Sequence, residues 1–197
     1  FKMNLKSNKV NVIQILPGGV VTAKDTAEIE LDANGEFVRN PEVDLVKVAV
    51  VERHQGTGNV ACGFLKGYGI KEGAVALSVA HDSHNIIVVG VNDEEMEFAV
   101  NSLVEQEGGI VLVKEGKVIE SMPMPIAGLM SDQSGEWVDQ KLTDIHEKAY
   151  EELGICGDVE PVMTLCFMSL AVIPEIKLTD MGLFDVTTFS FFPVEAE

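Results

Sequence analysis

Five consecutive residues carry the densest set of chemically able side chains in the sequence: His81, Asp82, Ser83, His84 and Asn85. Imidazole and carboxylate groups bind zinc and related metals, and they also move protons. The two histidines are three positions apart, so an extended strand would point them to opposite faces of a sheet. Only a loop or tight turn lets both imidazoles converge, and Asp-Ser is favourable turn sequence.

Three interpretations of this cluster stay open. A complete metal site needs at least three protein ligands, and His54 and Asp82 could supply the remainder only if the fold brings them together. A structural turn would use Asp82 and Asn85 to bond the backbone. A binding surface would offer the same side chains, held at strand ends, to a ligand or to another domain.

A second polar stretch, VERHQGTGN, has a similar character. Glu52, Arg53 and His54 close an apolar run, and Asn59 follows two glycines. Polar residues at strand ends beside a glycine-rich bend are a common place for a site in a sheet protein. The two polar stretches could meet edge to edge in one sheet.

Most of the sequence that positions these residues predicts strands. The runs NVIQIL, VVTAKDTAEIEL and DLVKVAVVER are rich in apolar and β-branched residues, and Asn34-Gly35 is a strong turn signal. The crowded apolar side chains of DLVKVAVVER are typical of a strand buried on both faces. AVALSVA and NIIVVGV flank the histidine cluster, and IVLVKEGKVIESM predicts a hairpin that turns at Glu115-Gly116.

Two helices interrupt the strands. Asn92 is a good N-cap for the first, which Gly108-Gly109 stops, and its expected buried stripe is Met96, Ala99, Val100, Leu103 and Val104. The second lies near residues 134–153 and ends at Gly154. Strand groups with two helices predict an α+β fold. We expect one domain spanning residues 1–197, with a mixed or mostly antiparallel sheet and two main helices packed on one side of it.

Composition excludes several classes of function. The formal net charge of −18 argues against binding to nucleic acid or to an anionic membrane, because both need a basic surface. No apolar run approaches the roughly 20 residues of a membrane span, and the first residues lack the apolar middle of a signal peptide. The three cysteines form no C-x-x-C pair, which favours a reducing, cytoplasmic compartment.

Several long and unusual motifs resemble one family. VERH-x-GTGN, AHDSHN, PIAGLMSD and PEIKLTD-x-G are similar to the C-terminal domain of bacterial and archaeal adenine deaminases of the amidohydrolase type. The likeness spans nearly the whole chain, including the opening VNVIQILPGGVVT. It implies a parent enzyme that hydrolyses adenine to hypoxanthine and ammonia, with a divalent metal, manganese or iron, held in an N-terminal barrel.

The resemblance gives this chain no catalytic residue and no metal ligand, because the H-x-H motif of that barrel has no counterpart here. Its implied partners are the barrel of the same enzyme, adenine through that enzyme, and further copies in a homo-oligomer. One hypothesis is that polar side chains of this chain lie at the mouth of the barrel and orient purine or exclude water. The candidates are Arg53, His54, Asn59, His81, Asp82, His84 and Asn85.

The alternative hypothesis is a module for assembly or stability without contact to substrate. Here the polar motifs only bond turns, while VMTLCFMSLAVI and FDVTTFSFF bury against partner subunits. The second of these segments holds four phenylalanines near the end of the chain, Phe184, Phe189, Phe191 and Phe192. Packing in the core of the chain itself is the ordinary expectation for such residues.

Overall fold

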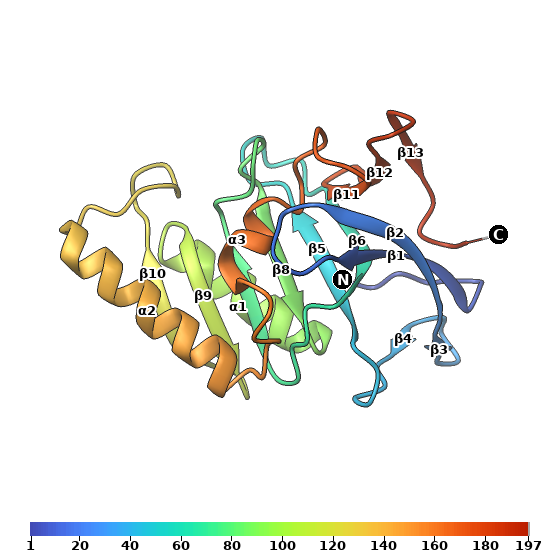
Figure 1. The fold of residues 1–197 in the computed structure, drawn as a ribbon, viewed down its shortest axis with the longest axis horizontal. Helices are drawn as coiled ribbons and strands as arrows, with labels where there is room; N and C mark the ends of the chain where they lie inside the picture. The colour runs from blue at the N-terminus through green and yellow to red at the C-terminus, as the bar shows by residue number, and fades with distance from the viewer. Residues whose placement is uncertain (197) are drawn as a thin grey trace.

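An eight-stranded sheet forms the centre of the computed structural model, which describes residues 1–196 (Figure 1). All neighbouring strands in it are antiparallel except β1 and β6, which run parallel. In spatial order the strands are β10 (Lys117–Pro123), β9 (Gly109–Lys114), β7 (Ala74–Leu77), β8 (Ile86–Gly90), β5 (Leu45–Val51), β6 (Val60–Lys66), β1 (Lys9–Ile15) and β2 (Thr22–Glu28).

Two smaller sheets and three helices complete the described part of the chain. One small sheet has three strands, β11 (Ile176–Thr179), β12 (Gly182–Asp185) and β13 (Ser190–Phe192), and the other pairs β3 (Glu30–Leu31) with β4 (Phe37–Val38). The helices are α1 (Asp93–Glu105), α2 (Gly135–Glu151) and the short α3 (Pro161–Cys166). This mostly antiparallel sheet with two long helices confirms the predicted α+β class.

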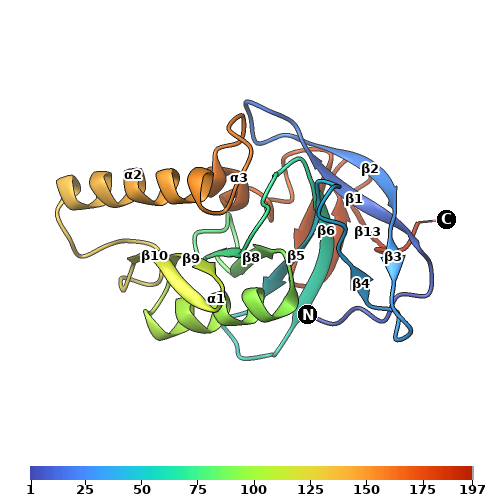
Figure 2. The same ribbon diagram turned by 90° about the horizontal axis from the view of Figure 1, so that it is seen from below.

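The helices lie on opposite faces of the large sheet, so the expectation that they share one side is wrong (Figure 2). Strand β7 shows the reason, because its side chains alternate between the faces. Ala74 and Ala76 belong to the apolar cluster that α1 covers, whereas Val75 and Leu77 belong to the cluster that α2 covers. A central strand that is apolar on both faces needs cover on both faces.

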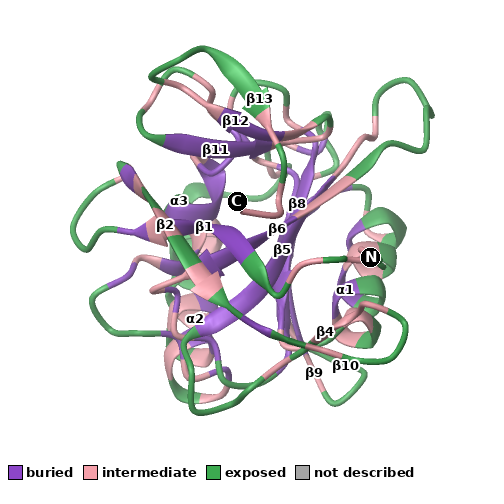
Figure 3. Ribbon diagram, turned by 90° about the vertical axis from the view of Figure 1, so that its right-hand side faces the viewer, coloured by how far each residue is buried: buried purple, intermediate pink, exposed green. Residues whose placement is uncertain are grey.

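Strand β5, which leads into the loop of residues 52–59, is almost completely buried. Six of its seven residues are buried, as its apolar sequence predicts (Figure 3). The one charged residue among them, Lys47, pairs with Asp93 at 2.7 Å. A buried cation needs such a partner, and Asp93 at the start of α1 supplies it.

Helix α1 begins as its sequence predicts, because the side chain of Asn92 accepts a hydrogen bond from Glu95 N at 2.8 Å. Its buried stripe is narrower than expected. Met96, Ala99 and Leu103 are buried, but the side of the helix that carries Val104 is open, and this valine is 60% exposed. The last turn of α1 therefore presents an apolar side chain to solvent.

The phenylalanines near the end of the chain also differ from the expectation of core packing. Phe184 is buried, Phe192 is half-buried, and Phe189 and Phe191 are 76% and 50% exposed. Both exposed rings pack edge-on against Phe184, at centroid distances of 5.2 and 5.1 Å. Phe191 lies opposite Phe184 in the small sheet, whereas Phe189 comes just before β13.

Candidate functional site

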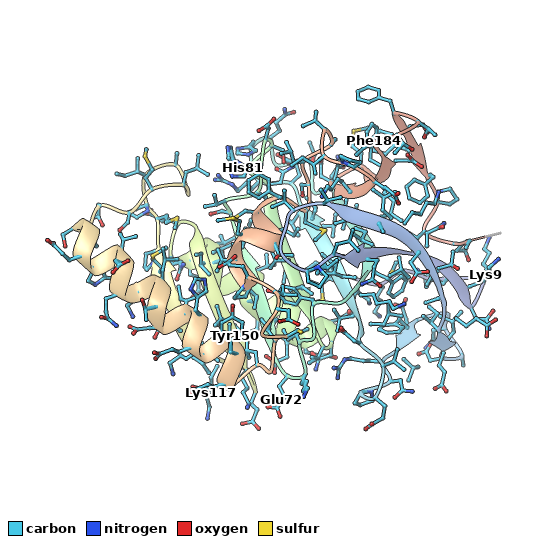
Figure 4. The ribbon with its side chains drawn as sticks, in the orientation of Figure 1. Lys9, Glu72, His81, Lys117, Tyr150 and Phe184 are labelled. Carbon is cyan, nitrogen blue, oxygen red and sulfur yellow. The ribbon has the colours of Figure 1, made fainter. Side chains whose placement is uncertain are left out.

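The two polar stretches meet at one edge of the large sheet. Strands β5 and β8 are antiparallel neighbours, and Val51 at the end of β5 pairs with Ile86 at the start of β8. The loop of residues 52–59 therefore leaves the sheet where the loop of residues 80–85 enters it. Figure 4 labels His81 at this edge.

The three histidines of these loops lie together. His54 Nε2 is 2.7 Å from the carbonyl oxygen of Ser83, and the rings of His81 and His84 pack edge-on with centroids 5.4 Å apart. A tight turn makes this possible, since His84 N donates to Ala80 O at 2.6 Å and His84 has a φ of 53°. Phe167, just after α3, packs against His81, and the centroids of the two rings are 4.8 Å apart.

Arg53 fastens three loops to one another. Its backbone N–H donates to Asn85 Oδ1 at 3.3 Å, and its Nε donates to His84 O at 2.6 Å. Its Nη2 donates to Ala127 O at 2.9 Å, in the loop of residues 126–130. The loops 52–59, 80–85 and 126–130 are called here the three-loop cluster. They carry the motifs VERH-x-GTGN, AHDSHN and PIAGLMSD, which lie far apart in the sequence.

Two small residues allow the third loop to approach. Ser78 Oγ donates to Gly128 O at 2.5 Å and accepts from Gly109 N at 2.8 Å. A Cβ on Gly128 would lie 3.0 to 3.2 Å from the Arg53 guanidinium, and Gly128 has a φ of 74°. Ser78, Gly128 and Phe167 were missed as site residues, because no local pattern announces a contact between loops. The motif PIAGLMSD was the one available signal.

Glu52 organises its own loop. Its carboxylate accepts hydrogen bonds from the backbone N–H groups of His54, Gln55 and Thr57 and from the Thr57 hydroxyl. The bonds from Thr57 and Gln55 contribute most, and together they lower the pKa of Glu52 to about 2. This carboxylate is therefore charged throughout the physiological range, and its hydrogen-bonding capacity is spent within the loop.

The electrostatics keep His84 neutral. Burial lowers the pKa of His84 below its usual value, and the neighbouring His81 and Arg53 lower it further. Its Nδ1 atom is buried and has no hydrogen-bond partner among the described residues. A neutral imidazole with an unsatisfied ring nitrogen can accept or donate one further hydrogen bond, depending on its tautomer.

The remaining candidates, Asn85, Asp82 and Asn59, make fewer contacts between the loops. Asn85 is buried and receives the Arg53 N–H, as the turn interpretation expects, but Ser83 rather than Asp82 supplies the other bond of the turn, from Asn85 N to Ser83 Oγ at 3.4 Å. Asp82 is exposed. Asn59 lies at the far end of its loop, where its carbonyl accepts from Glu52 N at 2.9 Å.

No group of three or more histidine, cysteine, aspartate and glutamate side chains in residues 1–196 is arranged to hold a metal ion. The helices of this part of the chain also lack the combination of length and hydropathy that a membrane span requires. The fold is an α+β domain in which three loops, joined by Arg53, bring polar residues together at one edge of the large sheet.

The chain belongs to the adenine deaminase C-terminal domain family, whose model matches residues 19–190. Adenine deaminase 2 of Desulfotalea psychrophila is 67% identical over 99% of this chain. The adenine deaminases of Ligilactobacillus salivarius and Bacillus subtilis are 47% and 45% identical, over 100% and 99% of the chain. The chain spans about a third of the length of these relatives, 33 to 34% in each case.

Proposed function

We propose that residues 1–197 act as one accessory domain of an adenine deaminase, which hydrolyses adenine to hypoxanthine and ammonia with a metal held in another part of the enzyme. In this proposal the three-loop cluster faces the substrate site of that other part. Manganese or iron would supply the metal-activated hydroxide that attacks the purine. The role of this chain is to orient the base and to keep water out.

The observation that carries this proposal is the convergence of the three loops on Arg53. A turn that only connects two strands needs no third loop, whereas Arg53 joins three segments separated by up to 74 positions. The result is an edge where His84, His81 and His54 lie beside the Arg53 guanidinium. Imidazoles and guanidinium groups can hydrogen-bond the ring nitrogens of a purine and stack on its face.

The test is to substitute His81→Ala and His84→Ala separately in a full-length adenine deaminase that carries this chain as its last third. We expect kcat/KM for adenine to fall by about tenfold in each variant, since one lost hydrogen bond or stacking contact is worth about 1.4 kcal/mol. Metal content should stay the same. His146→Ala is the matched control, because His146 lies on α2 and contacts Glu160.

Unchanged kcat and KM in both histidine variants would contradict a role at the substrate site. A fall in activity together with a loss of bound metal would also contradict it, because the proposal gives these residues no part in holding the metal. The two readouts therefore separate contact with substrate from general damage to the enzyme.

A second candidate function, assembly into a homo-oligomer, is favoured by the exposed rings of Phe189 and Phe191. Large exposed apolar patches on soluble proteins commonly mark contact surfaces. The double substitution Phe189→Ser and Phe191→Ser removes both exposed rings and keeps Phe184, against which they pack. Light scattering of the full-length enzyme should then show a smaller species. An unchanged mass would exclude this surface as the subunit contact.

A further inference from the structure

A groove of about 390 Å³ runs beside the three-loop cluster, between the last turns of α1 and the end of β5. Its lining combines five aliphatic residues, Val51, Ile86, Val100, Leu103 and Val104, with Glu52, Arg53, Gly56, Ser78, Glu107 and Gly108. Val104 is 60% exposed, although it continues the apolar pattern of α1. A helix that keeps an aliphatic residue on the rim of an apolar groove is typical of a surface that another segment covers.

One end of the groove is formed by Glu52 and Arg53, so the groove is continuous with the three-loop cluster. A third charged residue, Glu107, also lines the groove, and the described residues show no ion pair between it and Arg53. Glu52 and Arg53 differ in the hydrogen-bonding groups that they still offer. Glu52 is bonded within its own loop, as described above. Arg53 spends Nε on His84 O and Nη2 on Ala127 O, but the described residues give its Nη1 no acceptor and give the guanidinium no carboxylate partner.

We propose that this groove is the docking site for the rest of the adenine deaminase polypeptide. The segment that docks places an aliphatic side chain against Val100 and Val104 and an acceptor, a carboxylate or a carbonyl oxygen, on Arg53. This inference rests on the proposed function. It adds the surface and the chemistry by which the domain is held against its partner.

Two observations favour this occupant over a second copy of the chain. About two thirds of each matched relative lies outside the region that this chain covers, so further polypeptide is covalently linked to this region in every one of them. The chain itself carries a formal net charge of −18, and two copies docked through the same groove would bring these charges together. An arginine without an ion pair at the end of this groove instead suits an acceptor on a different surface.

Hydrogen exchange of backbone amides tests the proposal directly. We would compare the 197-residue chain with a full-length adenine deaminase that carries it. Amides of residues 52–59 and 100–108 should exchange at least tenfold more slowly in the full-length enzyme, because docking covers them. The hairpin turn at Glu115-Gly116, which lies outside the groove, should exchange equally in both proteins.

A matched pair of variants then separates docking from folding. Val104→Arg fills the groove and places a second cation near Arg53, whereas Val118→Arg adds the same charge at an exposed valine of β10. Both chains should fold, since both valines lie at the surface. Only Val104→Arg should abolish the protection of residues 52–59 in the full-length enzyme.

Equal exchange in the short chain and the full-length enzyme would overturn the inference. So would protection that appears in the short chain alone as its concentration rises, because a second copy would then be the occupant. Exchange rates do not depend on turnover. Inactive histidine variants with intact protection would therefore support docking, whatever becomes of the substrate role.

Discussion

Lys177 provides a test of the packing between the three-stranded sheet and the loop before β2, because it is a buried cation with no ion pair among the described residues. Its side chain lies in the middle of β11 and is 0% exposed, and its Nζ donates to Val20 O at 2.9 Å. Burial lowers the pKa of Lys177 to about 8, from 10.5 in the unfolded chain. A difference of about 2.5 pKa units corresponds to about 3 kcal/mol.

The sign of the effect on stability follows from which state binds the proton. Below pH 8 both states are protonated, and folding bears the full cost of burying the charge. Between pH 8 and 10.5 the folded chain has lost the proton and the unfolded chain still holds it, so the free energy of unfolding rises with pH. Lys177→Met cannot titrate. Its stability relative to the natural chain should therefore fall by about 3 kcal/mol across this window.

The assay is urea unfolding of the natural chain and of Lys177→Met, followed by circular dichroism at several values between pH 7 and 10.5. Other groups also titrate there. Burial raises the pKa of Cys166 to about 12 and raises that of Tyr68, and both effects lower stability as pH rises. They cancel in the difference between the two chains. Lys117→Met is the control, because it replaces a lysine by methionine at an exposed position.

A constant difference between the natural chain and Lys177→Met at every pH would refute the reasoning. It would mean that the ammonium is solvated in the folded state. The lost hydrogen bond to Val20 O shifts the whole difference by a fixed amount and does not affect the slope with pH. The slope is therefore the informative quantity.

Two further predictions concern local geometry. Gly73→Ala should lower the free energy of unfolding by more than about 3 kcal/mol, because a Cβ there would lie 1.9 Å from Val113 O at a φ of 69°. Gly18 is the control, since it has a φ of 80° but open space around it. In the same urea titration, Gly18→Ala should lower the free energy of unfolding by about 1 kcal/mol. Glu52→Gln should speed amide exchange in residues 54–58 at neutral pH. The natural loop should show this faster exchange progressively as the pH falls from about 4.5, the ordinary pKa of the Glu52 carboxyl, to about 2, its pKa in the folded chain.

Much of the fold follows from local signals in the sequence. Asn92 caps α1, Glu115 and Gly116 turn the hairpin with positive φ angles of 52° and 65°, and the apolar run of β5 is buried on both faces. Each of these features depends on a few neighbouring residues. The placement of the helices on opposite faces was not predictable in this way, because it depends on which face of the large sheet each connecting segment crosses.

The candidate site was only partly accessible from the sequence. The convergence of His81 and His84 follows from turn chemistry, since no regular strand allows it. The part played by Ser78 and Gly128 depends on contacts across 50 positions, which residue spacing does not encode. The exposed Phe189 and Phe191 show the same limit, because hydrophobicity predicts that a residue is covered but does not say by what.

Glu52 and Arg53 are adjacent, yet the fold uses their charges in opposite ways. The carboxylate turns inward to its own loop and is satisfied by four hydrogen bonds from three residues. The Arg53 guanidinium donates hydrogen bonds to two other loops, and its Nη1 has no acceptor within residues 1–196. If the edge were only a set of turns, a second carboxylate opposite Arg53 would stabilise it at little cost. In the docking proposal this guanidinium receives an acceptor from another part of the enzyme, because the two acids that line the groove with it, Glu52 and Glu107, form no ion pair with Arg53 among the described residues.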